Sequence, residues 1–436
     1  MQRVVKFITL GCKVNQYETN AMAQKFLEKG YKVIEEYEQN GEKPDICIIN
    51  TCTVTNMSDR KSRQMLRREK ENNKNVIVVA VGCYAQVAKN ELNKIPEIDL
   101  VLGNNEKVDI VKYVEDYINE NENNIEIEDV MQSRLFSDFG DITFTEKTRA
   151  VVKIQDGCDR FCSYCIIPYA RGRVRSRKPE SIISEITKIA EKDIKEVVIT
   201  GIHIASYGKD FKEEYKLIDL LEEINKIDGI ERIRLGSIEP LLITDEFVER
   251  LKKLDKICHH FHLSLQSGCD ETLKRMNRRY TTEQFREIVK RLRNAYNDVN
   301  LTTDIIVGFP GETEEEFEKT YHFLDEIKFY KMHVFKYSQR KGTKAAVMQN
   351  QIPGDIKELR SRRLIELSNK NEFEINQKYI GKKVEVLFEE EKEGVFKGHT
   401  ANYILVYCND EKENLSNKIQ EVECIQNLND HILAKY

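Results

Sequence analysis

The sequence lacks any long apolar segment. Its 436 residues contain no run of roughly 18 consecutive apolar residues, the length that indicates a membrane-spanning helix. The N-terminal stretch MQRVVKFITLGCK has too short an apolar core for a secretory signal peptide. Charged residues make up 33% of the chain, and the mean hydropathy is -0.56. We therefore expect a cytoplasmic protein that has no membrane partner.

The chain also has little net charge. Its 69 Lys and Arg residues nearly balance 74 Asp and Glu residues, which leaves a formal charge of -5. A global basic field that would attract nucleic acid is thereby excluded, so any RNA partner must be met by local basic patches.

Cysteine is the residue type that stands out by its number. There are eleven cysteines, an odd count. In a reducing compartment, such a set favours metal ligation or buried thiols over disulfides.

The first 120 residues alternate short apolar runs with charged, helix-length segments. The runs are KFITLG, DICIIN, VIVVAVG and DLVLG. This pattern predicts an α/β domain with a parallel sheet over residues 1-120. Residues 121-145 lose the periodicity and are rich in Asn and acidic residues, which predicts a linker or a surface excursion.

A second alternation of strands and helices fills residues 146-370. Its apolar runs are AVVKIQ, EVVIT, RIRLGS, FHLSLQS, TTDIIVG and MHVFKYS. Six such runs predict a partial (β/α)6 barrel. Residues 371-436 follow a charged helix, and their alternating strands with Gly-centred turns predict a small all-β barrel.

Three cysteines stand close together in QDGCDRFCSYC, directly after the first strand of the predicted central barrel. They are Cys158, Cys162 and Cys165. A disulfide needs an even count, and a structural zinc site needs four ligands. Three thiolates fit a [4Fe-4S] cluster with one open iron, placed at the barrel mouth where such folds keep active sites. A zinc site completed by a distant His, or surface cysteines without a metal, are the alternatives.

The C-x-x-x-C-x-aromatic-C pattern after a first strand resembles the radical S-adenosylmethionine (SAM) superfamily. The resemblance implies that the three cysteines hold a cluster whose open iron chelates the amino and carboxylate groups of SAM. Reduction then cleaves SAM to methionine and a 5'-deoxyadenosyl radical. It also implies that Tyr164 flanks the SAM adenine.

Other strand ends of the barrel are then expected to touch SAM, because the cofactor lies across the mouth. A glycine after a strand is otherwise a turn residue, and a strand-end Ser or Glu is otherwise a helix cap. The candidates are Gly201, Ser237, Glu239, Ser264, Gln266 and Gly308.

Cys12, Cys52 and Cys83 each end an apolar run of the N-terminal domain. The carboxyl ends of neighbouring parallel strands converge on one edge of a sheet, where open α/β sheets bind ligands. We therefore expect these three thiols to meet in space, although buried thiols without a metal are the alternative. The remaining cysteines are interpreted as small buried hydrophobes: Cys47, Cys258, Cys269, Cys408 and Cys424.

The blocks TLGCKVNQYET, NTCTV and VGCYAQ, together with the radical SAM core, are similar to the methylthiotransferases over nearly the full length. Further matching blocks are IIPYARGRVRSR, HLSLQSGCDETLKRMNRRY, DIIVGFPGET and FKYSQRKGT. The resemblance implies a second [4Fe-4S] cluster on the N-terminal cysteines, whose open iron presents sulfur. It also implies a C-terminal TRAM domain that binds RNA. It further implies that one SAM methylates the sulfur and that a second generates the radical.

Within this family, GCKVNQYET resembles the threonylcarbamoyl branch, whereas the isopentenyl branch more often has GCQMNEYDS. The implied reaction is methylthiolation of C2 of N6-threonylcarbamoyladenosine at position 37, in the anticodon loop of tRNA. It requires an electron donor such as flavodoxin or ferredoxin, and a sulfur donor. The alternatives are isopentenyladenosine 37, a ribosomal protein aspartate, or a non-catalytic iron-sulfur protein that binds RNA or acts as a sensor.

Two basic stretches are candidates for RNA contact. DRKSRQMLRREK places Arg60, Arg63 and Arg67 at helical spacing on one face, unless it is a merely solvated helix face. RGRVRSRK lies beside the predicted mouth and is suited to phosphate contacts; its arginines are Arg171, Arg173, Arg175 and Arg177. The predicted C-terminal barrel carries 8 Lys and Arg against 13 Asp and Glu from residue 371 onward. An acidic barrel must bind RNA through a local basic face or by shape.

Overall fold

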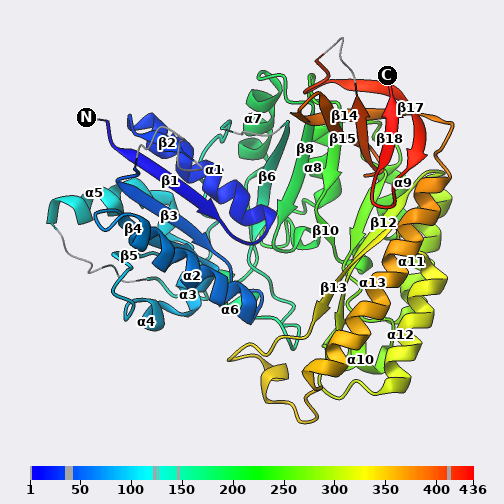
Figure 1. Cartoon of the computed structure of the whole chain (residues 1–436), viewed down its shortest axis with the longest axis horizontal. Coiled ribbons are helices and arrows are strands. Elements are labelled where there is room, and N and C mark those ends of the chain that lie inside the picture. The colour runs from blue at the N-terminus through cyan, green and yellow to red at the C-terminus, as the bar shows by residue number, and fades with distance from the viewer. Residues whose placement is uncertain (1, 35–42, 121–124, 126, 145–147, 410–413) are drawn as a thin grey trace.

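The computed structural model describes residues 2-34, 43-120, 125, 127-144, 148-409 and 414-436. These residues form an N-terminal α/β domain, a central curved sheet covered by helices, and a C-terminal β-barrel (Figure 1). None of the helices in this part of the chain combines the length and apolarity needed to cross a membrane.

The N-terminal domain is a five-stranded parallel sheet in the order β2-β1-β3-β4-β5. Four strands match the predicted runs, and the short edge strand β2 was not expected from the sequence. This order has its switch point between β1 and β3, where the carboxyl ends of the strands leave room for a ligand. The strands are β1 (Val4–Thr9), β2 (Lys32–Ile34), β3 (Ile46–Thr51), β4 (Ile77–Gly82) and β5 (Leu100–Val101), and the helices are α1 (Lys13–Glu28), α2 (Asn56–Asn72), α3 (Cys83–Val87), α4 (Lys89–Leu92), η1 (Glu106–Asp109) and α5 (Ile110–Glu120).

The segment predicted as an acidic linker contains no helix or strand over residues 125 and 127-144. It is nevertheless packed against its neighbours. Phe139 and Ile142 are buried in the core of the N-terminal domain. The Oε1 atom of Gln24 accepts hydrogen bonds from the backbone N–H groups of Thr143 (2.9 Å) and Phe144 (3.1 Å). This stretch is therefore a fixed connection between the two domains; residues 121-124, 126 and 145 lie outside the described part.

The central domain is the predicted partial barrel. β9 and β10 are separated by Gly236 alone, and they join two four-stranded sheets, β7-β6-β8-β9 and β10-β11-β12-β13. The six principal strands are parallel, and the short β7 runs antiparallel to β6. The strands are β6 (Arg149–Asp156), β7 (Arg175–Ser176), β8 (Glu196–Gly201), β9 (Arg232–Leu235), β10 (Ser237–Ile238), β11 (His260–Leu263), β12 (Asn300–Val307) and β13 (Lys331–Lys336).

Apolar residues on the outer face of this curved sheet pack against the surrounding helices. Every second residue of a strand points to the same face, so Val197 and Ile199 of β8 enter this core, whereas Glu196 and Thr200 point to the inner side. Threonine caps such as Thr313, which accepts from the N–H of Glu316 (3.2 Å), fix where helices begin. The helices are α6 (Ile167–Arg171), α7 (Pro179–Ala190), η2 (Ile204–Ser206), α8 (Leu217–Ile224), η3 (Pro240–Leu242), α9 (Asp245–Leu251), α10 (Asp270–Arg275), α11 (Thr282–Ala295), α12 (Glu314–Ile327) and η4 (Lys344–Val347).

A long helix, α13 (Gly354–Gln377), leads into the closed C-terminal barrel, whose strand order is β14-β15-β16-β18-β17. The domain boundary predicted between residues 370 and 371 falls inside α13. The periodic pattern of a helix continues through this point, so it does not mark where one domain ends and the next begins. The barrel strands are β14 (Lys383–Lys392), β15 (Val395–Thr400), β16 (Leu405–Asn409), β17 (Ile419–Asn427) and β18 (Ile432–Lys435).

The C-terminal barrel docks on the N-terminal ends of the central strands (Figure 1). Tyr403 stacks on His260 of β11 with ring centroids 4.5 Å apart, and Arg234 of β9 lies over the Tyr403 ring at 4.8 Å. The opposite end of the central strands, where they reach their carboxyl termini, is thus left free of this barrel.

Candidate active site with two cysteine triads

The first triad, which we call the barrel triad, consists of Cys158, Cys162 and Cys165 on the loop after β6. All three are partly exposed, and the N–H of Cys165 donates to the carbonyl of Cys162 (3.0 Å). Gly157 makes the turn out of the strand with φ +72°, and an added Cβ would lie 1.8 Å from the carbonyl oxygen of Arg173. Only glycine fits this turn without displacing the triad.

Arg278 connects the barrel triad to the neighbouring strand ends. Its Nη1 donates to the sulfur of Cys162 (3.4 Å), and its Nη2 donates to Glu239 (2.9 Å) and to the carbonyl of Ser264 (2.8 Å). Burial raises the pKa of Glu239, but the hydrogen bond from His203 and the charge of Arg278 outweigh it and hold that pKa below its ordinary value. The Arg278 guanidinium therefore donates to the ionised carboxylate of Glu239 and to the sulfur of Cys162 at the same time.

Tyr164, predicted to flank the SAM adenine, is half-buried next to the same loop. Its ring packs against the small cluster that includes Met276, Phe309 and Tyr337. Burial and the neighbouring Cys162 raise its pKa well above the ordinary value, so the phenol stays neutral.

The other strand ends predicted to touch SAM lie around this mouth. Gln266 has φ +74°, a left-handed conformation, and its N–H donates to the carbonyl of Asp304 (2.9 Å). Gly308 also has a positive φ (+68°) and donates to the carboxylate of Glu312 (2.7 Å). Gly201 ends β8, and Ser237 begins β10 and is exposed. These contacts to SAM remain predictions.

The second triad, which we call the sheet triad, consists of Cys12, Cys52 and Cys83. Cys12 directly precedes α1, Cys52 directly follows β3, and Cys83 is the first residue of α3 after β4. A Cβ built on Gly11 would lie 2.9 Å from the sulfur of Cys52. Burial is the main cause that raises the pKa of Cys12 and of Cys52, and the charge of Cys83 adds to both. The three thiols therefore gather at the sheet edge, as the strand pattern predicts.

Arg171, the last residue of α6 after the barrel triad, reaches across to the sheet triad. Its Nε donates to the sulfur of Cys83 (3.0 Å), and its Nη2 donates to Asn15 (2.7 Å) and to Glu18 (3.0 Å) of α1. Its Nη1 also contacts Asp156 at the end of β6 (3.3 Å). One buried side chain thus ties the sheet triad to the strand that carries the barrel triad.

The chemistry of both triads fits iron-sulfur clusters. Burial raises the pKa of Cys165 to about 12 and that of Cys158 to about 11, so these thiols need a shared cation to become thiolates. Within the described residues, only His262, Asp304 and His333 bring three metal-type ligand atoms within 4.8 Å of one another. Neither triad is therefore drawn together around a single small ion, whereas a cluster spreads its three protein ligands over different irons.

The remaining cysteines confirm the interpretation as small buried hydrophobes. Their side chains are at most 2% exposed. They are Cys47, Cys258, Cys269, Cys408 and Cys424.

The prediction that all four arginines of RGRVRSRK contact RNA is wrong for three of them. Arg171, Arg175 and Arg177 are at most 1% exposed, because carboxylates and carbonyls from distant parts of the chain enclose them. Arg177, for example, donates to Glu185 (2.8 Å). Arg173 alone is exposed, in an ion pair with Asp159 (3.3 Å), and remains a candidate.

Two of the three arginines predicted on the basic face of α2 are exposed to solvent. Arg60 and Arg67 are exposed. Arg63 instead lies between Glu91 (3.2 Å) and the hydroxyl of Tyr84. The predicted basic face is therefore present, but one of its three arginines is engaged within the protein.

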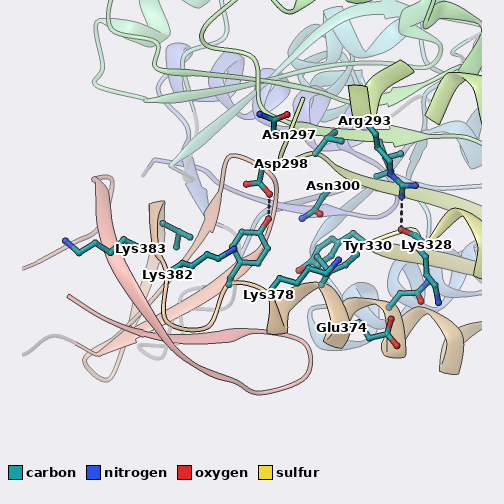
Figure 2. A pocket seen from close by; sticks show the side chains of 16 residues that line it. Arg293, Asn297, Asp298, Asn300, Lys328, Tyr330, Glu374, Lys378, Lys382 and Lys383 are labelled. Atoms are coloured by element: carbon teal, nitrogen blue, oxygen red, sulfur yellow. Dashed lines mark hydrogen bonds between the residues drawn. The ribbon is translucent and has the colours of Figure 1, made fainter. Parts of the chain in front are cut away.

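A local basic group also exists beside the acidic C-terminal barrel. A pocket of about 790 Å³ lies between α13, the N-terminal ends of β12 and β13, and β14 (Figure 2). Lys378, Lys382 and Lys383 line it and are exposed, while Asp298 is bound by the hydroxyl of Tyr379. Because it opens at the opposite end of the strands from both triads, this pocket is separate from the cysteine site.

Sequence reasoning missed Arg278 and the inward role of Arg171. Arg278 lies in MNRRY, a run with no spacing or charge pattern that sets it apart from a solvated segment. Its contacts with Cys162 and Glu239 join elements far apart in the chain, so only the tertiary structure could place it in the site.

Comparisons with known protein families agree with this geometry. The model of the Radical SAM superfamily matches residues 152-324, and that of the Uncharacterized protein family UPF0004 matches residues 4-103. The first segment contains the barrel triad, and the second contains the sheet triad.

Curated relatives match nearly the whole chain. The chain is 43% identical to a "Threonylcarbamoyladenosine tRNA methylthiotransferase MtaB" from Bacillus subtilis, over 92% of this chain and 89% of that protein. It is 38% identical to a "tRNA-2-methylthio-N(6)-dimethylallyladenosine synthase" from a Thermoanaerobacter species, over 87% of this chain and 81% of that protein. Both names describe enzymes that place a methylthio group on a tRNA adenosine.

Among solved structures, the radical SAM methyltransferase TsrM from Kitasatospora setae is similar in fold, with a TM-score of 0.58 at 17% identity. The match covers 80% of this chain and 77% of that one. The superfamily implies SAM and a [4Fe-4S] cluster as cofactors, which fits the barrel triad. Two triads on this fold and the full-length similarity to curated enzymes establish that the chain belongs to the tRNA methylthiotransferases of the radical SAM superfamily.

Proposed function

We propose that the protein attaches a methylthio group to C2 of N6-threonylcarbamoyladenosine at position 37 of tRNA. The observation that carries this proposal is that Arg171 joins Cys83 of the sheet triad to Asp156, at the end of the strand before the barrel triad, on a chain 43% identical to a relative named for this nucleoside. A second candidate is the same reaction on dimethylallyl (isopentenyl) adenosine, which the 38% identity to synthases of that class favours less. Both names specify tRNA, which argues against a ribosomal protein as the substrate.

In this proposal, the barrel triad holds a [4Fe-4S] cluster with an open iron for SAM, and the sheet triad holds a second cluster with an open iron for sulfur. When bound, these groups supply reductive SAM cleavage and the sulfur atom. An aromatic C–H bond has no leaving group and no useful acidity, so acid-base catalysis alone does not replace it.

The protein's own residues then position and shield these groups. Arg278 orients the Glu239 carboxylate and places positive charge at the sulfur of Cys162. Arg171 places positive charge at the sulfur of Cys83 and holds the N-terminal domain against β6. We further propose that Tyr164 and the strand-end residues flank SAM, and that Arg173 contacts the RNA.

Partners follow from this chemistry. The reaction requires an electron donor such as flavodoxin or ferredoxin, and a sulfur donor that replenishes the sheet-triad site. The substrate is the anticodon loop of a tRNA, which places the enzyme in the cytoplasm.

The direct test is mass spectrometry of tRNA nucleosides from a strain that lacks the protein. Loss of 2-methylthio-N6-threonylcarbamoyladenosine, with its unthiolated precursor accumulating, is the expected result. Loss of the isopentenyl product instead would select the second candidate, and an unchanged nucleoside profile would contradict both.

The assignment of the barrel triad is tested on anaerobically reconstituted protein. Two clusters predict about eight irons for each chain. Replacing Cys158, Cys162 and Cys165 with Ala should halve the iron and abolish cleavage of SAM to 5'-deoxyadenosine. Unchanged iron in this variant would show that these cysteines hold no cluster.

The sheet triad is tested in the complementary way. Replacing Cys12, Cys52 and Cys83 with Ala should leave SAM cleavage intact while methylthiolated tRNA disappears. Cys47→Ala is the matched control, because Cys47 lies mid-strand in the same domain and should retain both activities. A triple variant that still methylthiolates tRNA would show that sulfur comes from elsewhere.

A further inference from the structure

Lys13 is a cation that has no hydrogen bond or ion pair among the residues that the structure describes. It directly follows Cys12 and is the first residue of α1. Helix α1 packs against β6 and β8 of the central barrel, and the Lys13 side chain at its start is solvent-accessible. Lys13 therefore extends from the N-terminal domain toward the inner side of the central barrel, into a space that water enters but protein surrounds.

A group of polar side chains faces the same space from three consecutive strands. His262 of β11, Asp304 of β12 and His333 of β13 bring their ligand atoms within 4.8 Å of one another. His262 Nε2 lies 3.2 Å from the Asp304 carboxylate, and its Nδ1 is 3.0 Å from the hydroxyl of Thr302. The N-terminal domain spans the gap between β6 and β13, because α1 packs against β6 and Asp59 of α2 accepts from Arg340 after β13 (2.7 Å). Lys13 lies in the same gap, and its charge adds to the burial that lowers the pKa of His333.

The position of this group relative to both triads is set by the strands. His262 lies two residues before Ser264, and Asp304 lies four residues before Gly308, so the group sits one to two side-chain layers below the strand ends assigned to SAM. Lys13 follows Cys12 of the sheet triad. A base held between SAM and the sheet triad would direct a substituent toward this group.

The two candidate nucleosides differ in what they would place here. The threonylcarbamoyl group carries a carboxylate, a hydroxyl and a ureido N–H, whereas the isopentenyl group is a hydrocarbon. Lys13 and His333 can donate to the carboxylate, and Asp304 can accept from the hydroxyl or the N–H. A hydrocarbon would leave these side chains desolvated without partners, which costs free energy. The polar lining thus matches the first nucleoside and opposes the second.

We propose that Lys13, His262, Asp304 and His333 form the subsite for the threonylcarbamoyl group, in which Lys13 and His333 hold its carboxylate. This inference rests on the proposed function and names the residues that decide between its two candidates. None of the four residues belongs to the barrel triad, and only Lys13 is next to a cluster cysteine, Cys12 of the sheet triad, so the subsite selects the substrate and takes no part in cleaving SAM.

The test compares three anticodon stem-loops: one with threonylcarbamoyladenosine, one with its methyl ester, and one with isopentenyladenosine. For the wild type, kcat/KM should fall roughly 10- to 100-fold from the acid to the ester, as for one lost charge-assisted hydrogen bond. Lys13→Gln should lower kcat/KM for the acid by a similar factor and leave the value for the ester unchanged. Lys29→Gln, at the other end of the same helix and exposed, is the control and should match the wild type.

His333→Ala provides a second variant that is distant in sequence from every cluster cysteine. It should also lose activity on the acid more than on the ester, with iron content and 5'-deoxyadenosine formation at wild-type levels. If kcat/KM for the acid and kcat/KM for the ester fall by the same factor in both variants, the subsite does not recognise the carboxylate and the inference fails. If the wild-type protein shows no activity on the threonylcarbamoyl substrate, the proposed function itself is refuted.

A metal ion is the competing occupant of the two histidines and Asp304. A stoichiometric divalent metal other than iron, retained by the wild type and lost in His333→Ala, would assign the group to that ion if Lys13→Gln also left the acid-to-ester ratio unchanged. That outcome would overturn the proposal.

Discussion

Replacing Glu18 with Gln should destabilise the contact between the N-terminal domain and the central barrel. Glu18 is 1% exposed and accepts from Lys107 (2.5 Å), Lys153 (2.7 Å) and Arg171 (3.0 Å). Asp156 is the other carboxylate that contacts this group, through Lys153 and Arg171. The substitution keeps the shape of the side chain but leaves three buried cations with one carboxylate.

The loss of stability depends on whether a cation that contacted Glu18 can release its proton in the variant. Removing one partner of a buried ion pair costs about 3-5 kcal/mol. Lys107 can limit this loss by releasing its proton, since Glu18 is the carboxylate it contacts. Its ordinary pKa is 10.5, so neutralising it at pH 7 costs about 5 kcal/mol and at pH 9 about 2 kcal/mol, at about 1.4 kcal/mol for each pH unit.

The sign of the pH dependence is therefore fixed. Keeping Lys107 charged in the variant costs about 3-5 kcal/mol, so folded Lys107 loses its proton between pH 7 and pH 9 while the unfolded lysine keeps it. The unfolded state then binds more protons, and stability rises with pH. In the wild type, burial raises the pKa of Glu18, but Arg171 and the two lysines outweigh it and hold that pKa well below the ordinary value. Glu18 thus stabilises the wild type above the ordinary carboxylate pKa and loses this contribution only in acid. The deficit of the variant should shrink between pH 7 and pH 9.

The assay is anaerobic thermal unfolding at one scan rate, followed by circular dichroism. At about 2-4 °C for each kcal/mol in a unit of 150-250 residues, the midpoint should fall by on the order of 10 °C at pH 7 and by roughly half of that at pH 9. Glu28→Gln, exposed at the far end of α1, should leave the midpoint unchanged. A midpoint within about 2 °C of the wild type at pH 7, or an equal deficit at both pH values, would refute the reasoning.

Three further changes give distinct readouts. Gly157→Ala would set a Cβ 1.8 Å from a backbone carbonyl oxygen, so reconstituted protein should lose about half of its iron, whereas Gly140→Ala, with nothing within 4 Å, should keep it. Tyr403→Ala should cost about 3-4 kcal/mol of docking and speed protease release of the C-terminal barrel, because the stacked ring is lost; unchanged cleavage would contradict this. Replacing Arg60 and Arg67 together with Gln should lower the salt-dependence slope of tRNA binding by about 2, and an unchanged slope would remove α2 from the RNA interface.

Much of the fold was predictable because its signals are local. Apolar runs of strand length, separated by helix-length charged segments, mark the parallel strands β1, β3, β4, β6, β8 and β12. Each cysteine of the sheet triad follows the end of such a run, and the barrel triad lies in the loop after another, so their places at the strand ends follow from strand geometry. β2 was missed because its short segment carries no such run.

The RNA contacts were predicted less well, since charge in a sequence does not reveal which distant groups will enclose it. RGRVRSRK has the composition of a phosphate-binding stretch. Three of its arginines are buried, because Glu18, Asp156 and Glu185 reach them from α1, β6 and α7. Their spacing in the chain gives no sign of these partners.

The sequence by itself determined which segments form most of the parallel strands, the two sets of three thiols and the class of chemistry that three-ligand clusters permit. Only the tertiary structure decided how the sets are used. It turned Arg171 inward between Cys83 and Asp156, brought Arg278 to Cys162, and packed α1, which begins at Lys13, against β6 and β8 of the barrel. The physical reason is that periodicity and spacing report on neighbours along the chain, whereas the pairing of buried charges depends on which distant segments the closed fold brings together.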